Sequence, residues 1–490
     1  MDQPLICVTV TGHSTEELRR ARDAATLADI VELRLDSVAR CDVAAALSGR
    51  QKPVVVTCRP AWEGGGFTGS EEERRRILAA AMELGAEFVD VEASAAFAAD
   101  LIQARQGRGI ILSSHVFDGV PEDLRARYQT LRATGAEVVK LAVNANRLSD
   151  SLPLFELAAS VRHDGPSRHV LLAMGEAGIP TRVLAARLQN RWTYAGNAVA
   201  PGQVPADRLV KDFRIRRVEA DSALYGVVGN PVIHSLSPAM HNSGFAASGM
   251  KAVYLPLQAV DAQDFIEFAG AMGLRGASIT TPYKVDLMAA VDDVEPLARR
   301  VGAINTLAVR DRRWIGANTD VEGFLRPLAG RINLRGVRAT VLGAGGAARA
   351  VAVALADQHA RVTVSARNNQ RAAEIAALVG GTVGGFPPPS GSWDVLINAT
   401  TAGTHAQPVN PIEGAALDGE IVFDLVYAPA VTPLLAAADR EGCLTIGGLE
   451  MLVAQAERQF EIWTGQRPPH GLFQQAALSA IASPQASGVL

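Results

Sequence analysis

The segment Val138-Val-Lys-Leu-Ala-Val143 is an apolar run of strand length with a single lysine inside it. It is one of eight short apolar runs in roughly the first 200 residues, and polar stretches of helical character separate them. Several runs are continuously apolar rather than alternating, which is typical of parallel strands buried on both faces. The runs are Leu5–Val10, Ile30–Leu35, Pro53–Cys58, Phe88–Glu92, Gly109–His115, Val138–Val143, His169–Met174 and Trp192–Gly196.

Eight alternations of strand and helix in this length predict a (β/α)8 barrel. An open doubly wound sheet would use the same elements, but this part of the sequence has no glycine-rich dinucleotide turn, which favours the barrel. We therefore expect an α/β protein whose first domain, a barrel, covers residues 1–217 and is closed by the helical segment Pro205–Arg217.

Composition narrows the class of protein. The chain has 490 residues, 48% apolar and 20% charged, with a formal net charge of −4, so we expect a globular protein that does not bind nucleic acid. The four cysteines lie far apart and the nine histidines lack metal-binding spacing, which predicts neither disulfides nor a metal site. We read no targeting peptide or membrane span, because the chain enters a strand-like run at once, and we expect a cytoplasmic protein.

Large polar residues lie within or just past the apolar runs, at the strand ends where a barrel carries its chemistry. Each alone could be an ordinary buried or salt-bridged side chain, but eight of them at the ends of successive strands favour an active site. They are Glu32, Arg34, Arg59, Glu92, His115, Lys140, Arg182 and Gln203.

Lys140 has the most specific chemistry of this group. A lysine inside an apolar run is desolvated, which favours the neutral amine, a nucleophile toward a ketone. The resulting imine acidifies the neighbouring C–H bond and suits β-elimination of water, for which His115 is the expected proton shuttle, with Glu92 orienting its ring. Three arginines are suited to bind a carboxylate: Arg34, Arg59 and Arg182.

Over residues 5–217 these pieces resemble the type I 3-dehydroquinate dehydratase family. The resemblance implies that Lys140 is the Schiff-base lysine, His115 the general acid/base and Glu92 its partner, and that Glu32, Arg34, Arg59, Arg182 and Gln203 bind substrate. Val116 and Val199 depart from the family pattern, which usually has Asp and Ser there, and we expect them to affect the rate rather than the reaction. The matching pieces are Glu32-Leu-Arg34, Thr57-Cys-Arg59, Glu63-Gly-Gly65, Asp90-Val-Glu92, Ser114-His115, Lys140 and Ala200-Pro-Gly-Gln203.

In the second half, Thr340-Val-Leu-Gly-Ala-Gly-Gly-Ala-Ala-Arg-Ala350 predicts a strand, a glycine-rich turn and a helix whose N-terminus binds a pyrophosphate. The next strand, Arg361–Val364, leads into arginines rather than an acidic residue, which favours NADP over NAD, although both arginines could simply be solvated. We expect a Rossmann-type NADP-binding domain over residues 322–448. Its expected contacts here are Gly343, Ala344, Gly345, Gly346, Ala347, Ser365, Arg367 and Arg371.

Residues 223–485 resemble shikimate dehydrogenase. The motifs are Gly229-Asn-Pro-Val-Ile-His-Ser-Leu-Ser-Pro-Ala-Met-His-Asn242, Ser278-Ile-Thr-Thr-Pro-Tyr-Lys284, Gly302-Ala-Ile-Asn-Thr306, Gly316-Ala-Asn-Thr-Asp320, Asn398-Ala-Thr-Thr401, Asp424-Leu-Val-Tyr-Ala-Pro429 and Gly447-Gly-Leu-Glu-Met451. The resemblance implies that Lys284 and Asp320 are the catalytic pair. Ser278 and Thr281 replace the usual Asn and Ile. Further implied contacts are, for substrate, Ser235, Ser237, Thr280, Asn305, Tyr427 and Gln455 and, for NADP, Asn398, Thr400 and Gly448.

The two resemblances imply a bifunctional enzyme that dehydrates 3-dehydroquinate to 3-dehydroshikimate and reduces this to shikimate with NADPH. The alternatives are a quinate/shikimate dehydrogenase activity in the second half, or a non-catalytic metabolite sensor, which should have lost Lys140, Lys284 or Asp320. We expect a substrate-binding domain over residues 223–321, completed by 449–490, after the connector Val218–Ser222. The expected partners are small-molecule substrates alone, without nucleic acid or membrane, in a monomer or homodimer.

Overall fold

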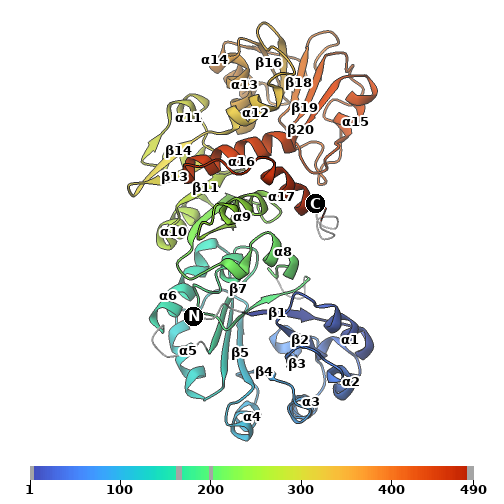
Figure 1. The fold of residues 1–490 in the computed structure, drawn as a ribbon, viewed down its shortest axis with the longest axis vertical. Helices are drawn as coiled ribbons and strands as arrows, with labels where there is room; N and C mark the ends of the chain where they lie inside the picture. Colours follow the sequence, from blue (N-terminus) through green and yellow to red (C-terminus); the bar gives the residue numbers. More distant parts are fainter. Residues whose placement is uncertain (1–4, 162–167, 198–201, 483–490) are drawn as a thin grey trace. The chain divides into compact units, whose positions relative to one another are not determined.

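The computed structural model describes residues 5–161, 168–197 and 202–482 (Figure 1). The chain divides into two compact units, one of Met1–Ala223 with Lys251–Met272 and the other of Leu224–Met250 with Gly273–Leu490. Residues 251–272 therefore group with the first unit, although the sequence analysis placed them in the second part of the chain.

The first unit is a nearly closed barrel of eight parallel strands in the order β7-β6-β5-β4-β3-β2-β1-β8. Strand β1 pairs with both β2 and β8, and the Arg191 amide before β8 donates to the His169 carbonyl in β7 at 3.0 Å. The predicted barrel is thereby confirmed over the open sheet. The strands are β1 Leu5–Val10, β2 Ile30–Arg34, β3 Val54–Thr57, β4 Phe88–Glu92, β5 Ile110–Val116, β6 Val138–Asn144, β7 His169–Met174 and β8 Trp192–Ala195.

Helices and short 3-10 turns connect the strands of the barrel. The first turn of α3 shows why one of them starts where it does: the Ser70 side chain accepts from the Glu73 amide, and Glu71 to Glu73 complement the positive end of the helix dipole. The helices are α1 Thr15–Ala24, α2 Val43–Leu47, α3 Glu71–Glu83, α4 Ala98–Arg105, α5 Leu124–Ala133, α6 Leu152–Ser160, α7 Ile179–Val183, α8 Ala206–Lys211 and, in the grouped segment, α10 Ala262–Met272.

A six-stranded mixed sheet, in the order β10-β9-β11-β13-β14-β12, follows the barrel in the sequence. Strand β13 runs antiparallel to both β11 and β14, whereas β9 and β11 are parallel. Its strands and neighbouring helices are β9 Ala223–Gly229, α9 Ser237–Ala247, β10 Ala252–Gln258, β11 Gly276–Ile279, β12 Asp293–Val294, α11 Pro296–Val301, β13 Thr306–Arg310, β14 Arg313–Ala317 and α12 Asp320–Leu328.

A second six-stranded sheet is entirely parallel, in the order β17-β16-β15-β18-β19-β20. The first strand, β15, lies in the middle of the sheet. The next strands, β16 and β17, are added on one side of it, and β18 to β20 are added on the other side. This strand order is the Rossmann topology that the sequence predicted. The elements are β15 Arg338–Leu342, α13 Gly346–Asp357, β16 Arg361–Ser365, α14 Asn369–Val379, β17 Thr382–Val383, β18 Val395–Asn398, β19 Ile421–Asp424, α15 Pro433–Arg440, β20 Leu444–Gly447, α16 Gly448–Thr464 and α17 Leu472–Ile481.

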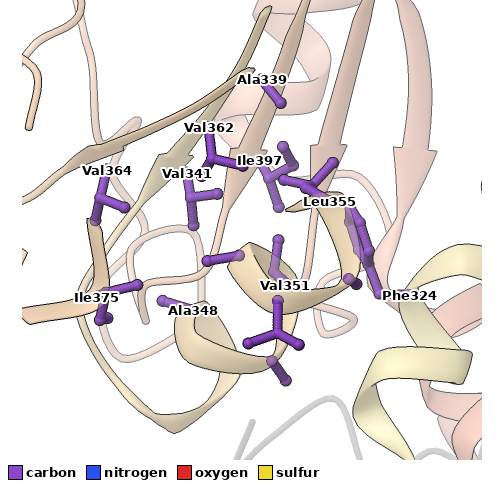
Figure 2. Packing of buried hydrophobic residues seen from close by; sticks show 14 of the residues in the cluster. Phe324, Ala339, Val341, Ala348, Val351, Leu355, Val362, Val364, Ile375 and Ile397 are labelled. Carbon is purple, nitrogen blue, oxygen red and sulfur yellow. The ribbon is translucent and has the colours of Figure 1, made fainter. Parts of the chain in front are cut away.

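The core of the Rossmann sheet explains why α13 is rich in small residues. Figure 2 shows Ala348, Val351 and Leu355 of α13 facing strand residues such as Val341 and Ile397. All five are fully buried. Small side chains let the helix approach the sheet closely, which holds the glycine-rich turn before it firmly in place.

Candidate active sites

Lys140 of β6 lies inside the barrel and is 6% exposed. Its Nζ donates to Asp90 Oδ2 at 3.0 Å and lies 4.0 Å from Glu32 Oε1. The same nitrogen sits over the Tyr194 ring, 4.4 Å from its centroid. Lys140 is thus buried as predicted. Its amine is also paired with Asp90 and Glu32, two carboxylates that the sequence did not predict as its partners.

Arg59 ties the carboxylates of this site together. Its guanidinium donates to Glu92 Oε1 at 2.7 Å, to Asp90 Oδ1 at 2.9 Å and to Ser113 Oγ at 2.8 Å. Burial alone would raise the pKa of Asp90, but Arg59 and Lys140 outweigh it and hold that pKa well below its usual range. Asp90 is therefore the ionised partner of both cations.

Glu63, and not Glu92, is the carboxylate beside His115. His115 Nδ1 lies 2.8 Å from Glu63 Oε1, and the His115 amide donates to the same oxygen at 3.0 Å. The carboxylate of Glu92 instead contacts Arg59 and Arg74. The expected pairing of Glu92 with His115 is corrected accordingly, because Glu63 reaches the ring from the loop that follows β3.

A glycine explains how this loop reaches the site. A Cβ added to Gly65 would lie 2.1 Å from the Arg59 carbonyl oxygen, so only glycine permits the close return of the chain. The Glu63-Gly-Gly65 match was the sequence signal that could have identified Glu63. Asp90 also carried a signal, because residues 90 and 92 of a strand point to the same side.

Burial and charge set the protonation of the Glu63–His115 pair. Burial lowers the pKa of His115 well below its usual value, and the cations Arg59 and Lys140 lower it further. Burial raises the pKa of Glu63 to about 7, against the opposing effect of Arg59. The imidazole is therefore neutral and able to accept a proton.

Of the other predicted barrel residues, Glu32 accepts from the hydroxyls of Thr9 at 2.6 Å and Thr57 at 2.8 Å. Gln203 Nε2 donates to the same Thr9 oxygen at 3.3 Å, which brings Gln203 beside Glu32. Arg34 is paired with Asp36 at 2.9 and 2.7 Å.

Arg182 lies on α7 and is 2% exposed. Its Nη1 is 3.5 Å from the carbonyl of Tyr194, whose ring lies beside Lys140. Burial lowers the pKa of Arg182 to about 10. Val116 ends β5 and is half-buried, and the expectation for Val199 lies outside the described residues.

The second site centres on an ion pair. Lys284 Nζ donates to Asp320 Oδ2 at 2.6 Å. The other oxygen of Asp320 accepts from Asn305 Nδ2 at 2.7 Å, and the same amide nitrogen lies 3.4 Å from Gln455 Oε1. The structure thus brings together four of the predicted residues, from the loop after β11, the start of α12, the loop before β13 and α16.

Gln459, which the sequence analysis did not single out, braces this site. It is fully buried, accepts from Ser278 Oγ at 2.7 Å, and donates to the Asn305 carbonyl at 3.0 Å and Thr306 Oγ1 at 3.1 Å. Ser278, noted above as a departure from the family pattern, therefore supports Asn305 through Gln459. Gln459 follows Gln455 by one helical turn, which is the signal that could have identified it.

Four further predicted substrate residues lie on several elements. Ser235 and Ser237 are at the start of α9, where the Ser237 amide donates to Ser235 Oγ at 3.2 Å. Thr280 follows β11 directly and is half-buried. Tyr427 follows β19, and burial raises the pKa of its hydroxyl. Their contacts with substrate stay predictions.

The glycine-rich turn between β15 and α13 has the shape that a dinucleotide needs. Gly343 has φ of +112°, and a Cβ added there would lie 3.0 Å from the Ala399 carbonyl oxygen. No heavy atom lies within 4 Å of a Cβ added to Gly345, so that side of the turn is open. An added Cβ on Gly346 would lie 3.3 Å from Lys284 Cδ, so the turn adjoins the ion pair of Lys284 and Asp320. Ala344 belongs to the same turn, and Ala347 lies in the first turn of α13.

Of the remaining predicted cofactor residues, Arg367 and Arg371 are exposed after β16. Asn398 is fully buried, donates to Asp424 Oδ1 at 2.9 Å and accepts from Thr400 Oγ1 at 2.7 Å, so its side chain holds the loop. Ser365 is likewise buried and donates to the Gly385 carbonyl. A Cβ added to Gly448 would lie 2.2 Å from the Leu425 carbonyl, which gives this glycine a packing role.

Fold and geometry define a two-site α/β enzyme, with a buried lysine in a barrel and a lysine–aspartate pair beside a Rossmann turn. Residues 6–219 match the type I 3-dehydroquinase family. Residues 227–307 match the shikimate dehydrogenase substrate binding domain, and residues 448–478 match the shikimate 5'-dehydrogenase C-terminal domain.

Individual proteins are similar to one or both halves. A bifunctional 3-dehydroquinate dehydratase/shikimate dehydrogenase of Arabidopsis thaliana, described as chloroplastic, is 33% identical, covering 96% of this chain and 84% of that protein. A shikimate dehydrogenase (NADP(+)) of Moorella thermoacetica is 39% identical over 54% of this chain and 96% of its own length. A crystal structure of a shikimate dehydrogenase in complex with NADP+ has a TM-score of 0.50 and 33% identity, covering 54% of this chain and 97% of that one.

The chain belongs to the family of bifunctional 3-dehydroquinate dehydratase/shikimate dehydrogenases. It is a bifunctional enzyme of the shikimate pathway, with a lyase in its first half and an NADP-dependent oxidoreductase in its second. The enzymatic prediction is thereby confirmed over the non-catalytic alternative. Among the described helices, none is both long and apolar enough to cross a bilayer.

Proposed function

We propose that Lys140 is the nucleophile of the dehydratase and forms a Schiff base with the ketone of 3-dehydroquinate. The observation that carries this role is its position, buried inside the barrel with Nζ held by Asp90 at 3.0 Å and Glu32 at 4.0 Å. The amine adds to the carbonyl carbon and a water molecule leaves, which gives an imine whose positive charge acidifies the adjacent C–H bond.

His115 takes up the proton from that carbon, since burial and neighbouring cations keep its imidazole neutral. The hydroxyl group on the next carbon leaves as water with the proton that His115 returns, which completes the elimination and restores the neutral imidazole. A further water molecule hydrolyses the imine and frees Lys140. Glu63 acts through His115: its oxygen, 2.8 Å from Nδ1, keeps the proton on that nitrogen and leaves Nε2 as the base.

We propose Arg182 as the residue that binds the substrate carboxylate. Its guanidinium is buried where burial lowers its pKa to about 10, and an incoming carboxylate would favour its charged form. Glu32 and Gln203 meet at the Thr9 hydroxyl and are suited to bind substrate hydroxyls. Arg59 and Arg34, already bonded to acidic side chains, shape the charge around the site.

Sodium borohydride tests the lysine assignment. Treatment of the full chain with borohydride and 3-dehydroquinate should leave a covalent adduct on the peptide containing Lys140, detected by mass spectrometry. Lys140→Ala should remove both the adduct and the dehydration. Dehydration that persists in Lys140→Ala would contradict the assignment.

In the second site we propose that Lys284 donates a proton to the developing alkoxide of 3-dehydroshikimate. Asp320 holds its Nζ at 2.6 Å, and Asn305 fixes Asp320 from the other side at 2.7 Å. We propose that the substrate is bound by six further side chains: Asn305, Gln455, Ser235, Ser237, Thr280 and Tyr427.

The open turn at Gly343–Gly346 fits the pyrophosphate of NADP, and exposed Arg367 and Arg371 suit its 2′-phosphate. The bound cofactor supplies the hydride. Lys284→Met should lower kcat of the reduction by at least about tenfold with less change in KM, because proton donation acts in the transition state. A change confined to KM would make Lys284 a binding residue instead. Assays with quinate and shikimate as alternative substrates would define selectivity.

We also propose a reducing compartment, the cytoplasm, because Cys7, Cys41, Cys58 and Cys443 are all free thiols. Fractionation of the source cells tests this placement. A monomer or homodimer is the proposed assembly, to be measured by light scattering coupled to gel filtration.

A further inference from the structure

Arg74 of α3 is a fully buried charged residue that lies behind the barrel site. Its guanidinium donates through Nη1 to Glu92 Oε2, and through Nε and Nη2 to Glu71 at 2.9 and 2.7 Å. It also packs 4.8 Å from the ring centroid of Phe97. A charge so deeply buried is tolerated only with paired partners, and Glu92 is its buried partner.

Alternating charges connect Arg74 to the proposed Schiff-base nitrogen. Glu92 presents Oε2 to Arg74 and Oε1 to Arg59, the latter at 2.7 Å. Arg59 in turn donates to Asp90 at 2.9 Å, and Asp90 accepts from Lys140 Nζ at 3.0 Å. A helix on the outside of the barrel is thus linked to Nζ by four consecutive ion pairs.

Loss of Arg74 would change each of these ion pairs in turn. Glu92 would be left with Arg59 as its partner in a position where burial already raises the pKa of its carboxyl group. Protonation of Glu92 would then leave Arg59 with Asp90 as its remaining strong partner. Asp90 is the carboxylate that holds Nζ, so the placement of the Lys140 amine would change.

We propose that Arg74 is a positioning residue of the dehydratase, which places the Lys140 amine through Glu92, Arg59 and Asp90. The inference rests on the proposed role of Lys140 as the Schiff-base lysine. It assigns to α3 a part in the reaction, which Arg74 exerts through these three side chains.

Three full-length variants test the proposal: Arg74→Met, Arg74→Lys and Glu71→Gln. Arg74→Met should lower kcat of dehydration at least tenfold with KM within about twofold, because the amine and not substrate binding is displaced. Arg74→Lys keeps a cation beside Glu92 and should recover part of the loss of kcat, although an ammonium group cannot reproduce the two bonds to Glu71. Glu71→Gln removes a half-exposed ion pair, and its kcat and KM for dehydration should match those of the wild type.

As a control for the second unit, kcat for reduction of 3-dehydroshikimate by each variant should stay within about twofold of the wild-type value. Circular dichroism of each variant reports on folding. A wild-type kcat in Arg74→Met would overturn the proposal. So would an Arg74→Lys variant as slow as Arg74→Met, since the role would then be packing. If Arg74→Met does not fold, Arg74→Gln replaces it with the same criteria. Failure of borohydride to label Lys140 in the wild type would overturn the proposed function and this inference with it.

Discussion

Glu63 and Glu92 are both buried acids near Arg59, and their contacts give them different tasks. Glu63 meets His115 at 2.8 Å, whereas Glu92 meets two arginines. Burial raises the pKa of Glu63 to about 7. The carboxylate that orients His115 therefore forms as the pH rises through neutrality.

This gives the dehydratase an expected pH dependence. Below about pH 7 Glu63 is protonated and loses the negative charge that favours the Nδ1–H form of His115, so kcat/KM should fall on the acid side and rise toward pH 8. Glu63→Gln should lower kcat/KM at least about tenfold and abolish this acid limb. The measurement is kcat/KM from pH 5 to 9, with reduction by the same chain as the control. An unchanged acid limb in Glu63→Gln would show that another group titrates.

Arg367 carries the prediction about cofactor choice. The wild type should prefer NADP over NAD by at least tenfold in kcat/KM, about 1.4 kcal/mol. Arg367→Asp should erode or reverse that preference, since a carboxylate repels the 2′-phosphate and accepts from a ribose hydroxyl. Arg361→Asp, an exposed change at the opposite end of β16, is the matched control. Equal use of both cofactors by the wild type would refute the role.

Part of the site could be predicted from single residues and part could not. A lysine inside an apolar strand is visible in the sequence, and Lys140 lies where that pattern placed it. The partner of His115 lies 52 residues earlier, in a loop whose course depends on Gly65, so no local pattern pairs the two. The sequence offered Glu92 instead because it ends a strand.

At the scale of elements, the turn between β15 and α13 combines two glycines with different requirements. Gly343 needs a positive φ and lies against the Ala399 carbonyl, whereas Gly345 has φ of −99° and open space beside it. The first glycine permits the backbone conformation of the turn, and the second leaves open the space that we propose for the pyrophosphate.

Because the two glycines differ in this way, substitutions at them should affect NADPH binding and protein stability separately. Gly345→Ala should leave the thermal midpoint within a few degrees and raise KM for NADPH by about tenfold, because the methyl group occupies space needed by the pyrophosphate. Gly343→Ala should lower the midpoint, because alanine is strained at φ of +112°. Thermal unfolding and KM measured on both variants decide the matter. An unchanged KM in Gly345→Ala would place the pyrophosphate elsewhere.

Periodicity predicted these elements well. The runs of the barrel and the strand–turn–helix at Thr340 to Ala350 correspond to strands and helices of the structure. The order of strands within a sheet was reachable only through the Rossmann motif and the count of eight alternations, because strand pairing depends on residues far apart.

At the scale of the whole molecule, the division into units does not follow the connector alone. Residues 251–272 group with the barrel. Asp264 of α10 is fully buried and accepts from the amides of Leu148 and Ser149 at 3.0 and 2.9 Å, in the segment that follows β6. A carboxylate that accepts from two backbone amides at the start of a helical turn is a stabilising contact.

Asp264→Ala should destabilise the first unit by about 1–3 kcal/mol, because one buried and one partly buried amide lose their acceptor. The separate fragment 1–220 should fold and dehydrate 3-dehydroquinate but unfold at a lower temperature than this unit of the full chain, for the same reason. Calorimetry of the full chain, Asp264→Ala and the fragment makes the comparison. Equal midpoints in all three would show that the segment contributes nothing to the barrel.

The central claim is that one chain carries two separate sites for consecutive reactions, with Lys140 in one and Lys284 in the other. Consumption of NADPH on addition of 3-dehydroquinate tests it most directly, in the wild type, Lys140→Ala and Lys284→Met. The wild type should consume NADPH and form shikimate; Lys140→Ala should do so only when given 3-dehydroshikimate; Lys284→Met should accumulate 3-dehydroshikimate. Rapid NADPH consumption by Lys140→Ala with 3-dehydroquinate would contradict the account, because the second site would then reduce that substrate directly.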